Sequence, residues 1–324
     1  MKIWGNIALK QGMSEEMRRD ENVVLIGLDL RNGGAFGVTP GMVEEFGEKR
    51  IVNMPIAEAG YTGVGVGAAA AGLRPIVELM YNDWATIASD QIINQAASIR
   101  YMFGGRISVP MVIRMPCGGY LREAGQHSHM LESWFAFIPG LKVVAPSTPM
   151  DAKGMIKAAI RDNNPVIFFE HKKLYTTRGE VSEDPEYIVP LGKADVKREG
   201  TDVSVFCYSY MVQLALKAAK DLENEGIQAE VVDLRSLSPL DMDTILKSIQ
   251  KTNRALCLQE TWLPCSVSSE VAAQIAEKAF DFLDAPIVRI GAKFCPIPFA
   301  PVLEDDVLPD VEEIKKKIRK LVKD

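Results

Sequence analysis

A single acidic residue, Glu58, stands among apolar and small residues in the segment 54–61. An acid at the start of a helical segment is favoured by the helix dipole, which is a purely structural role. A carboxyl group with such neighbours should also have a raised pKa, because burial disfavours the charged form. That pKa would suit proton transfer near neutral pH, so Glu58 is a candidate for catalysis as well as for a helix end.

Two of the three histidines, His127 and His129, lie in the segment AGQHSH at positions 124–129. The His-x-His spacing suggests a metal site, but His171 belongs to another segment and no carboxylate falls at a helical spacing that would complete zinc ligation. A histidine in a loop after glycine is better suited to proton transfer or to stabilising an oxyanion. The sequence therefore favours catalysis over metal binding here.

Glycine and alanine dominate residues 60–72, where Gly63 to Ala68 fits the loose dinucleotide pattern G-x-G-x-x-A and Asp83 follows twenty residues after Gly63. A dinucleotide turn has its first glycine directly after a strand, whereas residues 55–62 intervene here. We expect instead a helix of small residues that packs closely on another backbone, with nucleotide binding as the alternative. The sequence has neither a Gly-Asp dipeptide nor a G-x-x-x-x-G-K-[ST] motif, so the phosphates of any cofactor need another anchor.

Short β-rich runs alternate with helical-period segments along the whole chain, which is typical of parallel sheets with crossover helices. The predicted strands are residues 23–28, 51–54, 76–80, 111–115, 142–145, 166–170, 203–207, 229–234, 255–259 and 286–290. The predicted helices are residues 84–103, 211–225, 240–250 and 266–282. The aperiodic segment 178–200 is rich in charge, proline and glycine. We therefore predict an α/β fold of two parallel-sheet domains, residues 1–185 and 186–324.

The chain has 324 residues, of which 47% are hydrophobic and 25% charged, with a net charge of −6. The basic residues gather only near the C-terminus, in one face of an amphipathic helix, which argues against nucleic acid as a partner. Five cysteines without a Cys-x-x-Cys pair indicate free thiols in a reducing compartment. The sequence shows no signal peptide and no apolar stretch long enough to cross a membrane, so we expect a cytoplasmic protein.

Motifs spread over both predicted domains resemble the beta subunit of thiamine-diphosphate-dependent 2-oxoacid dehydrogenases. They are colinear and cover nearly the whole chain: MPIAEAG at 54–60, AGLRP at 71–75, GQHS at 125–128, PGLKVVAPS at 139–147, DAKG at 151–154, AAIRDNNPV at 158–166 and RSLSPLD at 235–241. The resemblance implies a thiamine-diphosphate pyrimidine-binding domain followed by a transketolase C-terminal domain.

The resemblance also implies partners. An alpha subunit would complete an α2β2 heterotetramer with thiamine diphosphate between the subunits, and it would supply the Gly-Asp-Gly motif that holds Mg²⁺ and diphosphate. That division of labour accounts for the absence of Gly-Asp in this chain. A lipoyl acyltransferase would be the second partner, with its lipoamide as the acyl acceptor.

Carried over residue by residue, the resemblance assigns roles to several side chains. Glu58 matches the glutamate that hydrogen-bonds N1′ of the aminopyrimidine, where an acid favours the tautomer that deprotonates C2. Trp84 falls where an aromatic ring lies against the aminopyrimidine, although Tyr81 is a nearby competitor. His127 matches the active-site histidine expected to stabilise charge or to assist acyl transfer to lipoamide, and the role of His129 is open.

Further implications concern a relay, a cation and the substrate. The segment 27–30 lacks the paired acids common in relatives, so an acidic proton relay between active sites would rest on Asp29 alone. A structural K⁺ would be held by backbone carbonyls of Ala159, Ile160, Asp162 and Asn164. The segment 116–125 carries bulky and charged residues where relatives are richer in glycine, which leaves the substrate open.

These observations predict the beta subunit of a 2-oxoacid or acetoin dehydrogenase, which cleaves a carbon–carbon bond next to the substrate carbonyl and then reductively acylates lipoamide. The segments 100–105 and 112–116 are more similar to acetoin-type members. One alternative is the C-terminal half of a split transketolase-like enzyme that acts on sugar phosphates. A non-catalytic nucleotide-binding α/β partner protein is the other.

Overall fold

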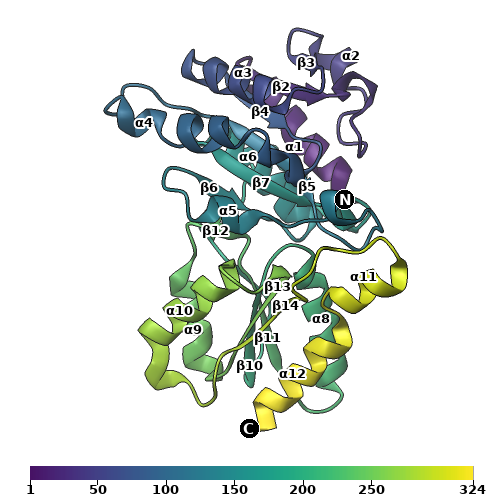
Figure 1. Cartoon of the computed structure of the whole chain (residues 1–324), viewed down its shortest axis with the longest axis vertical. Coiled ribbons are helices and arrows are strands. Elements are labelled where there is room, and N and C mark those ends of the chain that lie inside the picture. Colours follow the sequence, from purple (N-terminus) through teal and green to yellow (C-terminus); the bar gives the residue numbers. More distant parts are fainter. Residues whose placement is uncertain (324) are drawn as a thin grey trace. The chain divides into compact units, whose positions relative to one another are not determined.

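A computed structural model describes residues 1–323 and divides them into two compact units (Figure 1). The first unit contains Met1–Cys117 and Trp134–Leu191. The second contains Gly118–Ser133 and the described residues from Gly192 onward. The domain limits 1–185 and 186–324 remain a sequence prediction. Because the excursion of residues 118–133 belongs to the second unit, no single boundary in the sequence separates the two units.

The first unit is built on parallel strands in the order β6-β7-β5-β4-β2-β3. Their bounds are β2 (Val23–Leu28), β3 (Ile51–Met54), β4 (Arg74–Glu78), β5 (Val112–Cys117), β6 (Lys142–Val144) and β7 (Val166–His171). Most residues of these strands are buried, as expected for a parallel sheet covered on both faces. All six strands predicted in this half of the sequence are confirmed, with ends that shift by at most two residues.

Helices α1 (Gly5–Arg19), α3 (Glu58–Ala70) and α6 (Pro149–Arg161) accompany this sheet, together with the short α2 (Met42–Phe46) and α7 (Lys172–Tyr175). A small antiparallel pair, β1 (Lys2–Trp4) and β8 (Arg178–Glu180), lies apart from it. Helices α1 and α6 approach closely at Gly12, where an added Cβ would lie 2.5 Å from Ile156 Cγ2. Buried side chains of α1, α6 and the strands form one core.

The glycine-rich segment is the helix α3, so Gly63 to Ala68 lie inside a helix and not in a turn between strand and helix. This placement contradicts the dinucleotide alternative, which needs backbone N–H groups free to bind phosphate. The helix does pack closely at Gly65, but on a side chain and not on a backbone, because an added Cβ would lie 2.5 Å from Val77 Cγ2 of β4. On the other face of the helix, Gly60, Val64 and Gly67 are exposed.

The continuous helix predicted over residues 84–103 is wrong in detail. The structure has a 3-10 turn over Asn82–Thr86, a π-helical turn over Gln91–Ala96 and the short α4 (Ile99–Met102). The π turn is closed by the Ala97 N–H, which donates to the Ile92 carbonyl. Periodicity did not reveal these changes, because the apolar residues Ala88, Ile92 and Ala96 are buried as a regular helix would bury them.

The second unit has its own sheet in the order β14-β13-β10-β11-β9, which is parallel except for β9. Its strands are β9 (Asp195–Arg198), β10 (Val203–Cys207), β11 (Ala229–Asp233), β13 (Ala255–Trp262) and β14 (Val288–Ala292), and a short β12 spans Ser236–Ser238. Its helices are α8 (Tyr210–Glu223), α9 (Met242–Thr252), α10 (Val267–Ala279), α11 (Pro301–Val307) and α12 (Val311–Lys323).

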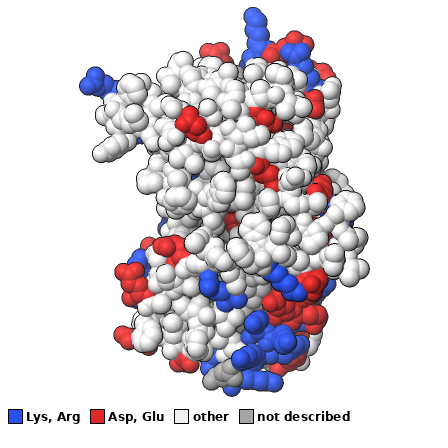
Figure 2. Space-filling view, in the orientation of Figure 1, with Lys and Arg blue, Asp and Glu red and all other residues white. Residues whose placement is uncertain are grey.

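Helix α12 runs beside α8 and confirms the predicted amphipathic helix at the C-terminus. Ile314, Ile318 and Leu321 are buried in the core of the second unit, while basic side chains gather over the exposed part of the helix (Figure 2). Within residues 1–323 no helix combines the length and apolar character needed to span a membrane.

Candidate active site

The strand order of the first unit places three of the predicted site residues along one sheet edge. Strand β2 pairs with β3 on one side and with β4 on the other, so the crossover after β2 leads to β3 and the crossover after β4 leads the opposite way, to β5. The carboxyl ends of strands at such a switch point are where open α/β sheets bind ligands. Asp29 follows β2, Glu58 follows β3 and Trp84 follows β4.

Glu58 is the first residue of α3 and only 5% of its surface is exposed. One helical turn later, Tyr61 is buried, and its hydroxyl group has no hydrogen-bond partner. Burial raises the pKa of Tyr61, and the nearby carboxyl groups of Glu58 and Glu78 raise it further. The start of α3 therefore presents a buried acid beside a neutral phenol whose hydrogen bond is not satisfied within the chain.

Asp29 lies exposed at the end of β2 in a left-handed backbone conformation, with φ of 55°. Its carbonyl oxygen accepts hydrogen bonds from the N–H groups of Asn32 and Gly34, both at 3.1 Å. The turn after β2 is thus fixed by backbone bonds, which leaves the Asp29 carboxyl group at the sheet edge.

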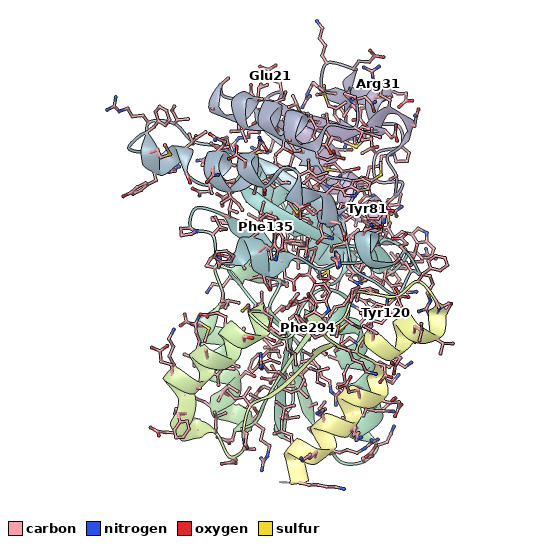
Figure 3. The ribbon with its side chains drawn as sticks, viewed as in Figure 1. Glu21, Arg31, Tyr81, Tyr120, Phe135 and Phe294 are labelled. Carbon is pink, nitrogen blue, oxygen red and sulfur yellow. The ribbon has the colours of Figure 1, made fainter. Side chains whose placement is uncertain are left out.

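Tyr81 and Trp84, the two aromatic residues that the sequence offered for the same role, form a pair. The Trp84 ring lies 5.0 Å from the Tyr81 ring in an edge-to-face arrangement, and Tyr81 (labelled in Figure 3) also contacts Phe36 edge-to-face at 5.5 Å. The Lys172 ammonium group lies 4.8 Å from the centre of the Tyr81 ring. The edge-to-face contacts and the Lys172 cation hold both rings in place, so the two rings form a rigid aromatic surface on which a flat ligand ring can pack.

Sequence reasoning missed a buried charged network beneath this edge. Arg114 of β5 is fully buried and binds Glu170 of β7 through two hydrogen bonds of 2.6 Å, while its remaining nitrogen pairs with Glu78 of β4. The Tyr175 hydroxyl donates to Glu170 Oε2 at 2.6 Å. The available signal was a charged residue inside each of three apolar strands, because such residues are rarely buried unless paired.

This network contains two carboxyl groups and one guanidinium group. Burial raises the pKa of Glu78, which Arg114 opposes and the charge of Glu170 reinforces. Burial alone would lower the pKa of Arg114, but the two carboxyl groups outweigh it and the pKa is raised. The shared guanidinium therefore links β4, β5 and β7 through their buried side chains.

His127 belongs to the second unit, where it closes a short 3-10 turn, Gly125–His127. The loop that carries it is closed at its base by the Gly118 N–H, which donates to the His129 carbonyl at 3.0 Å. The His129 ring lies 5.3 Å from the ring of Trp262, whose indole N–H donates to the Cys295 carbonyl. His129 thus packs on the body of the second unit and helps to hold the loop.

The third histidine, His171, has a local structural role, because its Nδ1 accepts a hydrogen bond from the Lys173 N–H at the start of α7. Over residues 1–323 the structure has no cluster of three or more His, Cys, Asp or Glu side chains that could hold a metal ion.

Three of the four carbonyl groups suggested for K⁺, those of Ala159, Ile160 and Asp162, already accept hydrogen bonds within the chain. The Arg74 guanidinium donates to the carbonyls of Ile160 and Asp162, both at 3.0 Å, and the Asp162 N–H donates to the Ala159 carbonyl. Each carbonyl oxygen keeps a second lone pair. A K⁺ ion at this place would therefore share two of its oxygen ligands with the guanidinium of Arg74.

Sequence reasoning also missed Glu132, which follows the loop that carries His127 and is the first residue of α5 (Glu132–Ala136). Burial raises its pKa to about 7, although a hydrogen bond from the Tyr208 hydroxyl at 2.5 Å opposes the shift. Its Oε2 has no partner, and the same is true of the buried hydroxyl groups of Ser128, Ser133 and Ser209. The segment after His127 therefore has three polar side chains, Ser128, Glu132 and Ser133, that each have a buried atom without a hydrogen-bond partner.

We predict that Glu132→Gln stabilises the chain at high pH and not at low pH. A raised folded-state pKa means that the wild-type protein loses stability as pH rises from the unfolded value of 4.5 through about 7. The loss amounts to about 3 kcal/mol and is absent in the neutral amide. Urea unfolding at pH 4.5 and pH 8 measures the change in the free energy of unfolding, with the exposed Glu277→Gln as control. A change caused by Glu132→Gln that is equal at both pH values would contradict the prediction.

Two family models match consecutive parts of the chain. The transketolase pyrimidine-binding domain matches residues 4–178, and the transketolase C-terminal domain matches residues 192–314. The solved structure of a split-gene transketolase, an inactive beta4 tetramer, superimposes with a TM-score of 0.81 over 99% of this chain and 98% of that one, at 22% identity. At this identity the likeness shows the fold alone.

Curated relatives are much more similar in sequence. The acetoin:2,6-dichlorophenolindophenol oxidoreductase subunit beta of Bacillus subtilis is 51% identical over 95% of this chain and 93% of its own length. The 2-oxoisovalerate dehydrogenase subunit beta of the same organism is 46% identical, with 97% of both chains covered. The pyruvate dehydrogenase E1 component subunit beta of Rhizobium meliloti is 45% identical over 96% of this chain and 68% of its own. The chain therefore belongs to the transketolase-like family of dehydrogenase E1 beta subunits, which includes those of acetoin, pyruvate and branched-chain 2-oxoacid dehydrogenases.

Proposed function

We propose that this chain is the beta subunit of the first, carbon–carbon-cleaving component of a 2-oxoacid or acetoin dehydrogenase complex. The observation that carries the proposal is the buried Glu58 at the N-terminal end of α3, at the switch point of the pyrimidine-binding sheet. Membership of the family indicates the class of reaction. The carboxyl group of Glu58 would supply the proton that activation of the cofactor requires from a beta subunit.

The residues at the sheet edge fit an aminopyrimidine. Glu58 would hold a proton at N1′ of the ring, the Tyr81–Trp84 pair would lie against its face, and Asp29 would exchange protons with solvent or with a partner acid. The unsatisfied Tyr61 hydroxyl supports a polar group at this place. When bound, thiamine diphosphate supplies the carbon nucleophile that attacks the substrate carbonyl and permits cleavage of the adjacent carbon–carbon bond.

We assign His127 to the later part of the reaction. A half-buried imidazole on a loop closed at its base can donate a hydrogen bond to charge that develops on the substrate, or transfer a proton during acyl transfer to lipoamide. With lipoamide as the acyl acceptor, the proposed reaction is that of an oxidoreductase with a disulfide acceptor.

The proposal includes partners and conditions. An alpha subunit would complete an α2β2 assembly and hold Mg²⁺ with the diphosphate, because this chain has no motif for either. A lipoyl acyltransferase would accept the acyl group, and K⁺ would bind near Ala159 to Asn164. The five cysteines are free thiols, which supports a reducing compartment such as the cytoplasm.

Cofactor binding tests the proposal. Thiamine diphosphate and Mg²⁺ are titrated by calorimetry into the beta chain, into a candidate alpha subunit from the same organism, and into the two combined. We expect no appreciable binding to the beta chain alone, and binding with turnover of acetoin or a 2-oxoacid in the complex. Strong NAD binding by the lone chain, or turnover of sugar phosphates without lipoamide, would instead favour one of the two alternatives.

A further inference from the structure

The loop before His127 has a backbone that its residues disfavour. Tyr120, Arg122 and Ala124 have φ values of 66°, 62° and 63°, in the region where residues other than glycine are strained. Ala124 combines its φ of 63° with a ψ of −172°, a region that only glycine occupies readily. Such a conformation persists only where surrounding contacts impose it, so the loop 118–126 needs anchors.

Two buried carboxyl groups of the second unit hold the backbone of this loop. Glu260 Oε1 accepts from the Gly119 N–H at 2.6 Å, and Glu304 Oε1 accepts from the Tyr120 N–H at 3.0 Å. Hydrogen bonds to a charged acceptor are among the stronger ones in proteins. Tyr120 (Figure 3) adds a third anchor, because its hydroxyl donates to the Pro309 carbonyl at 2.7 Å.

Glu304 has a second attachment to the same loop. Its Oε2 accepts from Arg122 Nη1 at 2.5 Å, and the same nitrogen lies 3.1 Å from the Pro301 carbonyl and 2.7 Å from Asp305. Glu304 is fully buried, whereas Arg122 is about a third exposed. One buried carboxyl group of α11 thus binds two of the strained residues at once, one through each oxygen.

Close packing also brings the loop against α11. A Cβ added at Gly119 would lie 2.7 Å from Leu308 Cδ1, so a larger residue at this position would have to displace the Leu308 side chain. Below the anchors, the bond between Gly118 and His129 closes the loop and fixes its length. The backbone from Gly118 to His129 thus forms a closed loop. Its first part, up to Ala124, is strained and is held by the two carboxyl groups, and His127 follows in its second part.

We propose that Glu304, acting through Arg122 and the Tyr120 backbone, is a positioning residue that holds the loop 118–126 in the conformation that presents His127 to the reaction. The inference rests on the role proposed above for His127. Strain at this site would be unnecessary in a loop that only connected two elements, because glycine or a longer turn would relieve it.

Three variants of the holoenzyme, assembled with the alpha subunit, test the inference. Glu304→Gln keeps an acceptor for the Tyr120 N–H but removes the buried one of the two carboxylates that bind Arg122, and Arg122→Gln removes the cation. Asp306→Asn is the matched control, because Asp306 lies on the same helix α11 and its exposed pair with Lys293 is broken. Each variant is assayed for kcat, for hydrogen–deuterium exchange at C2 of bound thiamine diphosphate, and for amide exchange of residues 118–126.

We expect Glu304→Gln and Arg122→Gln each to lower kcat by about tenfold or more, and the double variant to be no worse than either. C2 exchange should stay at the wild-type rate, because it depends on Glu58 and not on the loop, whereas the amides of the loop should exchange faster. The control should match the wild type in all three measurements.

Two results would overturn the inference alone: a kcat in Glu304→Gln equal to that of the control, or a parallel fall of kcat and C2 exchange that marks a general structural loss. If the wild-type holoenzyme itself showed no C2 exchange, the proposed function would fail and this inference with it. The three readouts therefore distinguish the two failures.

Discussion

Replacing Glu58 with glutamine should leave the assembly with the alpha subunit intact and slow hydrogen–deuterium exchange at C2 of bound thiamine diphosphate by at least about 100-fold. Glutamine has nearly the same volume and can still form a hydrogen bond, but it cannot hold and release a proton near neutral pH. The loss should therefore fall on kcat, because the proton is needed for the chemical step rather than for binding.

Quenched-flow exchange followed by NMR measures the C2 proton directly. The matched control is Glu44→Gln, which alters an exposed glutamate in the first turn of α2 and so preserves the comparison of an acid at a helix start. Exchange at the wild-type rate in Glu58→Gln would mean that another group activates the cofactor. A complete loss of assembly in Glu58→Gln would instead assign the residue to the subunit interface.

The second large effect concerns stability. Arg114→Met should destabilise the chain by about 3–5 kcal/mol at neutral pH, because it leaves Glu78 and Glu170 buried without their cation. Burial already raises the pKa of Glu78, and the guanidinium that opposes this shift would be gone. The destabilisation is therefore greatest at high pH and shrinks as pH falls below the unfolded pKa of this carboxyl group, where it is protonated in either state.

Urea unfolding of the chain at pH 4 and pH 7.5 measures this effect. Arg18→Met is the control, since it removes the exposed pair with Glu45, for which a loss below about 1 kcal/mol is expected. Adding Glu78→Gln and Glu170→Gln to Arg114→Met should restore part of the stability. A loss from Arg114→Met no larger than that of the control would show that the network contributes little to the fold.

Local patterns in the sequence predicted most of the fold. The strands could be read because buried parallel strands are short apolar runs between breakers, as at Val23–Leu28 and Val203–Cys207, whose predicted and observed bounds coincide. The break in the helix after Trp84 could not be read, because the π turn preserves the apolar spacing. The excursion of residues 118–133 could not be read either, since it depends on contacts with residues more than 100 positions away.

The candidate site was predictable to a different extent. Glu58 could be identified by its type and surroundings, and the carry-over from relatives added His127, Trp84 and Asp29. Glu304 and Glu260 had no such signal, because a glutamate on a short helix or strand is usually solvated, and only the fold brings their carboxyl groups to the strained backbone of the loop. Buried acids that act through other residues are thus the part of a site that sequence reasoning reaches last.

The excursion of residues 118–133 also bears on how such a chain can be divided by evolution or by the experimenter. The chain passes between its two units at three places, after Cys117, Ser133 and Leu191. A gene fragment that ends near residue 185 would encode the histidine loop but neither of the carboxyl groups that hold it. A fragment that begins near residue 186 would keep Glu260 and Glu304 but would lack Gly119 and Tyr120, whose backbone N–H groups they accept. Neither half is therefore a module that recombination could transfer whole, and a viable split would have to carry the loop as a separate piece.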